Sequence, residues 1–161
     1  MTTQPNQEVL ANLASIDLLT RALRSLDASI TATNANEKFI AAHLAALRAA
    51  AALLAAHAQP NSRRPTSVWV LIAKRTPEFA EWASFFAAGA GKRVAAEAGI
   101  AGAVTPREAD DLVREAHQFI DLVSDAIGVS RQLTLSQDAT TPKSLPNNVI
   151  TFKPRNSERT K

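Results

Sequence analysis

The side chains best suited to acid–base chemistry are three histidines, which lie far apart in the sequence. His43 and His57 fall fourteen residues apart on one predicted helix, about 21 Å at 1.5 Å per residue, so they cannot share a metal ion. Asp121, four residues after His117, could orient that imidazole, but a solvent-exposed polar face is the simpler interpretation. The chain has no Cys, no HExxH spacing and no glycine-rich phosphate loop, so the sequence predicts neither a metal site nor a cofactor.

His43 is the histidine with the most open interpretation, because it borders the apolar stripe of its predicted helix. Lys38 lies five residues before it and Arg48 five residues after it. Five residues rotate a helix position by about 140°, so neither base stacks on the imidazole. One interpretation is a histidine at the edge of the core, bonded to a neighbouring helix. The other is a contact with a ligand or RNA.

Four basic residues with no acid among them bracket a short apolar stretch that contains a tryptophan. The set is Arg63, Arg64, Lys74 and Arg75 around Trp69. Basic side chains for phosphates and an exposed ring for base stacking are what single-stranded nucleic acid requires. These residues, with Arg48, form the candidate site for nucleic acid or nucleotide. The competing interpretation is a solvated loop in which Trp69 points into the core.

Length and charge restrict the class of protein further. The 161 residues suit one domain, and 46% hydrophobic with 20% charged residues excludes a wholly disordered chain. The net charge of +3 is concentrated in residues 129–161, which hold six basic and two acidic side chains, against 12 and 13 in the rest. Apolar runs stay below the ~18 residues of a membrane span, and the first residues lack the basic and apolar regions of a signal peptide. We therefore expect a cytoplasmic protein without a membrane partner.

Apolar residues spaced by three and four predict four long helices and one short helix, with no strand. The expected ranges are about 7–30, 37–58, 68–73, 77–98 and 106–127. The second helix is rich in alanine, so neighbours can approach it closely and we place it at the centre. The predicted fold is all-α: an antiparallel four- to five-helix bundle over residues 1–128, followed by a flexible, disordered basic tail at 129–161.

Local signals set the expected helix ends. Thr105 and Glu108 predict a capping box at the start of the last helix. Asn36 and Thr76 are the expected N-caps of the second and fourth helices. Two glycines inside the fourth helix, at positions 89 and 91, indicate close approach of another helix, in the same subunit or a second one, since glycine otherwise weakens a helix.

Four stretches of sequence, in order, carry a family resemblance. They are HLAALRAAAALLAA from His43 with RRPTSVWVLIAK from Arg63, then PEFAEWASFFAAGA from Pro77, and TPREADDL from Thr105. Over about residues 36–127 they resemble a small family of actinobacterial HEPN-domain proteins. The resemblance implies a four- to five-helix bundle, commonly homodimeric. In the wider superfamily it implies binding of RNA or nucleotide and, in some branches, metal-independent RNA cleavage.

The cleaving branches carry an arginine, four to six residues and then a histidine, which serve as charge stabiliser and acid or base. This chain lacks that motif. Its nearest approach is Lys38 with His43, the only candidates for catalytic residues, and lysine offers a point charge in place of the arginine fork. The resemblance thus favours a domain that binds RNA or nucleotide without efficient catalysis. Two alternatives stay open: a structural or adaptor protein acting through protein contacts, suggested by the acidic last helix, and an RNase.

Overall fold

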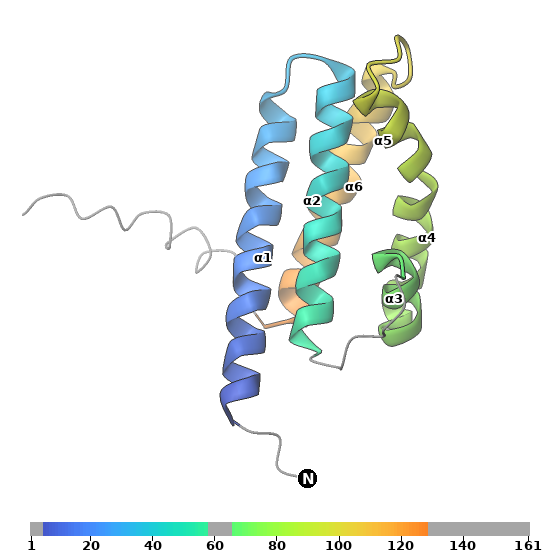
Figure 1. The fold of residues 1–161 in the computed structure, drawn as a ribbon. Coiled ribbons are helices and arrows are strands. Elements are labelled where there is room, and N and C mark those ends of the chain that lie inside the picture. The colour runs from blue at the N-terminus through green and yellow to red at the C-terminus, as the bar shows by residue number, and fades with distance from the viewer. Residues whose placement is uncertain (1–4, 58–65, 129–161) are drawn as a thin grey trace, which may run out of the picture.

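The computed structural model describes residues 5–57 and 66–128, and in these ranges it contains helices and turns but no strand. The helices are α1 (Pro5–Thr31), α2 (Ala35–Ala56), α3 (Val68–Arg75), the short 3-10 helix η1 (Pro77–Phe79), α4 (Ala80–Ala88), α5 (Ala90–Glu97) and α6 (Pro106–Ala126). Because α4 and α5 follow one another as one bent rod, five rods form the bundle, and the long rods α1, α2, α4–α5 and α6 alternate in direction (Figure 1). The predicted all-α bundle is confirmed. The predicted tail, 129–161, lies outside the described residues.

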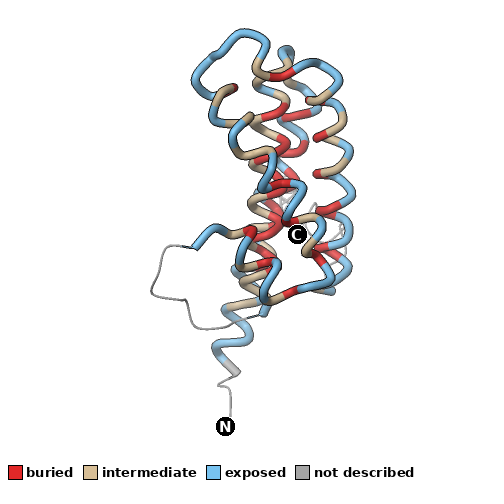
Figure 2. The backbone as a smooth tube through the Cα atoms, turned by 90° about the vertical axis from the view of Figure 1, so that its right-hand side faces the viewer, coloured by how far each residue is buried: buried red, intermediate tan, exposed pale blue. Residues whose placement is uncertain are grey.

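The alanine-rich helix α2 is the centre of the bundle, as its composition predicts. It packs against α1, α6, α5 and α3, and buried positions concentrate along the inside of the rods (Figure 2). Its alanines provide the closest surfaces, because a methyl side chain lets a neighbouring backbone approach. Those with no exposed surface are Ala42, Ala45, Ala46, Ala49, Ala50 and Ala52.

The same helix is long and apolar enough to cross a membrane, with a mean hydropathy of 1.8 over its most apolar window. Half of that window is buried inside the bundle. Since α2 is the helix around which the others pack, the need for a core accounts for its apolar composition.

Helix α1 extends beyond the part of the bundle that covers it. Leu19, Leu23 and Leu26 are buried, but Leu10 and Leu13, which continue their spacing of three and four residues, are exposed. The apolar residues of α1 keep the helical spacing of three and four, but those near its N-terminus lie beyond the helices that would cover them. Where α1 is covered, the Ser15 hydroxyl donates a hydrogen bond of 2.8 Å to the carbonyl of Ala52 in α2.

The fourth predicted helix is interrupted at Gly89, a break that the apolar pattern does not show. A Cβ at Gly89 would lie 3.4 Å from the His43 ring, so this glycine permits close packing of a side chain. Gly91 has open space around it among the described residues. Within one chain, the expectation of close approach therefore holds for Gly89 and not for Gly91; approach of a second subunit at Gly91 stays a prediction.

The helix caps follow the sequence in part. Thr105 and Glu108 form the predicted capping box at the start of α6. Helix α2 begins earlier than expected, because the side chain of Asn34, and not that of Asn36, accepts a hydrogen bond from the Glu37 N–H. Thr76 makes no side-chain cap, since its hydroxyl donates to the carbonyl of Ile72 in the preceding helix.

Candidate functional site: an acidic aromatic groove beside a closed core

Trp69 belongs to the core, which corrects its assignment as a stacking platform for nucleic acid. Its side chain is 5% exposed, and its ring stacks on Phe86 with centroids 5.2 Å apart and an interplanar angle of 19°. Phe119 closes another side at 6.2 Å. A buried indole presents no face to a base, because every side of its ring is already packed against other side chains.

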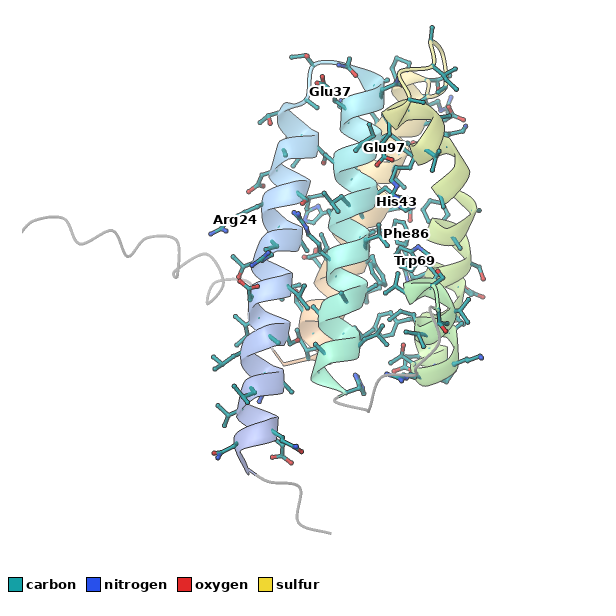
Figure 3. All side chains as sticks on the ribbon, in the orientation of Figure 1. Arg24, Glu37, His43, Trp69, Phe86 and Glu97 are labelled. Atoms are coloured by element: carbon teal, nitrogen blue, oxygen red, sulfur yellow. The ribbon has the colours of Figure 1, made fainter. Side chains whose placement is uncertain are left out.

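His43 is sealed into the same cluster. It is 1% exposed, and Figure 3 shows it between α2 and the α3–α4 rods, with Phe86 and Trp69. Its Nε2 lies 2.9 Å from the carbonyl oxygen of Phe86. Because a carbonyl only accepts, Nε2 carries the proton and donates it. The alternative of a histidine bonded to a neighbouring helix is therefore the one observed.

The electrostatics of this site favour a neutral imidazole. Burial lowers the pKa of His43 below 6.5, and the nearby Arg93 lowers that pKa further, against opposing contributions from the Phe86 hydrogen bond and Glu97. Nδ1 is buried and finds no hydrogen-bond partner among the described residues. A buried neutral ring with no access to solvent is placed to support the core at the Gly89 break, and not to exchange protons with a substrate.

Lys38 does not converge with His43. Its ammonium lies 2.7 Å from the Asp110 carboxylate of α6, on the surface, while the His43 ring points into the core toward α4. The two predicted catalytic residues are thus separated by the helix that carries them. This arrangement gives RNA cleavage by the pair no geometric support.

The basic residues of the predicted nucleic-acid site have different surroundings. Arg48 lies against α1, where it donates to the carbonyl of Arg21 at 3.3 Å and to the Ser25 hydroxyl. Lys74 and Arg75 occupy the last turn of α3 and form no ion pair within the described ranges. Arg63 and Arg64 lie outside those ranges.

One hollow on the described surface lies where α2, α4, α5 and α6 meet. It has a volume of 360 Å³, within the range of small-ligand sites. Phe39, Phe85 and Leu112 provide an apolar floor. At its edge, Lys92 of α5 forms an ion pair with Glu108 of α6. The hydrogen bonds from Lys92 and from Thr105 lower the pKa of Glu108 to about 2.

A second hollow of 260 Å³ adjoins it along α4 and α6 and is lined by Glu81, Trp82, Phe85 and Glu115. Phe85 lines both hollows, and although Phe86 next to it is buried, Phe85 is 46% exposed. We call the two hollows, with Phe85 between them, the Phe85 groove.

The Phe85 groove is acidic. Glu81 and Glu115 make no ion pair with any residue that the structure describes, and Asp111 is paired only with Arg114 of its own helix. Residues 5–57 and 66–128 hold ten basic and thirteen acidic side chains, so the described bundle is net negative. Such a field attracts cations and repels phosphates.

The sequence contains a signal for this groove beyond the apolar stripe. The last helix holds six acids, and Phe85 lies beside the stripe that Phe79, Trp82 and Phe86 form. Glu81 and Phe85 lie four residues apart, which places them on one helix face beside Trp82.

These features define an all-α bundle with a closed aromatic core and an acidic groove at Phe85. Residues 29–124 match the SAV_6107-like HEPN family, which is named from a Streptomyces protein. The match spans more than half of the chain, and the protein therefore belongs to this HEPN family. A search of curated proteins and a search of solved structures each found no match.

Proposed function

We propose that this HEPN domain is a non-catalytic protein-binding module, and that its Phe85 groove holds a cationic segment carrying an apolar side chain. One observation carries the proposal: an exposed phenylalanine lies between two hollows, beside Glu81 and Glu115, whose carboxylates pair with no residue in the described ranges. Covering the exposed part of this ring with an apolar side chain would remove apolar surface from water, which is favourable.

The groove and such a segment are complementary in chemistry. An apolar side chain placed on Phe85 and Trp82 would remove apolar surface from water. Lysine or arginine beside it would find Glu81 and Glu115, which fixes orientation and excludes anionic partners. A central aromatic anchor surrounded by polar groups is the usual composition of a binding hot spot.

The test uses the full chain and the synthetic pentapeptide Lys-Phe-Lys-Phe-Lys, with binding followed by calorimetry. Phe85→Ser is expected to weaken binding at least about tenfold, since roughly 1.4 kcal/mol of apolar contact is lost. Leu122→Ser is the matched control, because Leu122 is 44% exposed and lies outside the groove. Equal loss in both variants, or no binding by the wild-type chain, refutes the proposal.

The charge contribution needs a separate comparison. Glu115→Gln is expected to weaken binding of the pentapeptide and to flatten its salt dependence. Asp125→Asn removes an equal charge from an exposed position of the same helix and is expected to change little. A pentapeptide with glutamate in place of lysine should not bind. If it binds as well as the lysine form, charge complementarity is not the basis of recognition.

A second candidate, binding of RNA or nucleotide, is favoured by Lys74 and Arg75, which form no ion pair within the described ranges. Arg63 and Arg64 precede them closely in sequence. Fluorescence anisotropy with short single-stranded RNA at two salt concentrations tests it. Binding should fall with salt and with Lys74→Glu. Absence of binding at low salt, or binding unaffected by removing the four charges, excludes this candidate.

A further inference from the structure

The chain itself contains a segment with the chemistry that the Phe85 groove requires. Residues 149–155 read Val-Ile-Thr-Phe-Lys-Pro-Arg, an apolar run joined to two bases with no acid. We propose that this segment binds in the Phe85 groove of its own chain and competes there with external partners. This inference rests on the proposed function of the groove.

The order of residues in this segment suits an apolar floor with acidic edges. In an extended chain, successive side chains alternate between two faces. Ile150, Phe152 and Pro154 would then share one face, toward the ring of Phe85. Lys153 precedes a proline, which favours extended backbone at that position. Lysine and arginine side chains are long enough to pass over an apolar surface and place their charges at its edge.

The charges of the two partners are opposite. The segment contributes Lys153 and Arg155, and the groove contributes Glu81 and Glu115, which have no ion-pair partner among the described residues. In total, residues 129–161 hold six basic and two acidic side chains, whereas the described bundle has three more acids than bases. Two basic side chains in the segment, and two carboxylates that pair with no described residue, make this segment a better match than a neutral one.

The segment can reach the groove within one chain. Glu115 lies thirteen residues before Gly128, about 20 Å back along α6. Residues 129–148 separate Gly128 from the segment, and twenty residues span up to about 66 Å. A tethered ligand has an effective concentration near the millimolar range, so even a weak contact would be populated. Residues 58–65 contain two arginines but no large apolar side chain, so they lack the apolar group that the Phe85 groove requires.

The experiment uses the absence of cysteine in the chain. A nitroxide attached to the full chain through Ser157→Cys should broaden the amide signals of Phe85 and Ala88, because position 157 follows the bound segment directly. Phe152→Ser in the same labelled chain should restore those signals, and Thr160→Ser should not. Retained signals at Phe85 and Ala88 in the chain with native Phe152 overturn the inference.

Two further measurements separate the explanations. Labelled chain mixed with an isotope-labelled copy that lacks the nitroxide should show no broadening. If it shows the same broadening, the segment binds a second copy and the intramolecular proposal is wrong. Phe152→Ser should also increase the apparent affinity for Lys-Phe-Lys-Phe-Lys, about tenfold if nine-tenths of the grooves are self-occupied. Unchanged affinity with an undisturbed Phe85 signal rejects self-occupancy, while the binding itself would still support the groove.

Discussion

The burial of His43 predicts a specific dependence of stability on pH. The folded protein keeps the imidazole neutral, because burial lowers the pKa of His43 below 6.5. In the unfolded chain the ring takes up a proton as pH falls through about 6.5. The unfolded state then binds more protons than the folded state, so the free energy of unfolding decreases as pH falls.

The size of the effect follows from this linkage. Between about pH 7.5 and 5.5, protonation of an unfolded histidine lowers the free energy of the unfolded state by about 1.4 kcal/mol. If the folded ring stays neutral over this range, the wild-type protein loses that amount of stability through His43. Arg93 acts in the same direction and Glu97 opposes it, so the value is an upper limit.

Urea unfolding at the two pH values, followed by tryptophan fluorescence, measures the loss. His43→Gln keeps a donor for the Phe86 carbonyl but cannot titrate, so it should lose up to about 1.4 kcal/mol less than the wild type. Trp69→Phe is the control: it perturbs the same aromatic cluster without removing an ionisable group, and should keep the wild-type difference. If His43→Gln loses as much stability as the wild type, the claim of a neutral buried His43 is wrong.

Three further predictions concern the fold. Gly91→Ala should raise the free energy of unfolding by about 0.5–1 kcal/mol, because nothing obstructs a Cβ in α5; a lower melting temperature would contradict this. Thr105→Ala should lower stability by about 1 kcal/mol through loss of the capping box, as measured by urea unfolding. The pKa of Glu108 is lowered to about 2, so its stabilising effect is present above pH 4.5 and is lost as pH falls toward 2. The Glu108→Gln variant should therefore show a smaller fall in melting temperature over this pH range than the wild type.

The sequence was sufficient to predict those features of the fold that depend only on residues close together in the chain. The capping box needs only Thr105 and Glu108 at the right spacing, and the structure contains it. The central position of α2 follows from its alanines, since these leave room for neighbours wherever they pack. The helical class follows from the period of the apolar residues.

The parts that could not be predicted depend on tertiary contacts. The break at Gly89 coincides with the carbonyl of Phe86, which accepts hydrogen bonds from both the Gly89 N–H and the His43 ring. Helical spacing places Phe86 on the apolar stripe with Phe79 and Trp82, and Phe85 beside it. It does not show that Phe85 lines a groove, because a core-facing stripe is itself about 100° wide. The exposure of Leu10 depends on where the neighbouring helices end, which its own pattern does not encode.

The burial of Trp69 is a related case. A basic segment with a tryptophan fits both a nucleic-acid platform and a core helix, and only the position of Phe86 against the indole decides between them. Since the Trp69 ring is buried, only the positive charges of the α3 region favour nucleic-acid binding there. The exposed aromatic surface lies instead at Phe85, among carboxylates.

The most direct test of the account is to map where Lys-Phe-Lys-Phe-Lys binds on the full chain by amide chemical shifts. Binding in the Phe85 groove predicts that the largest shifts fall on Glu81, Phe85 and Glu115, and that Lys74 and Arg75 are unaffected. Shifts confined to the end of α3, or spread evenly over the bundle, would contradict the assignment of the groove as the recognition surface.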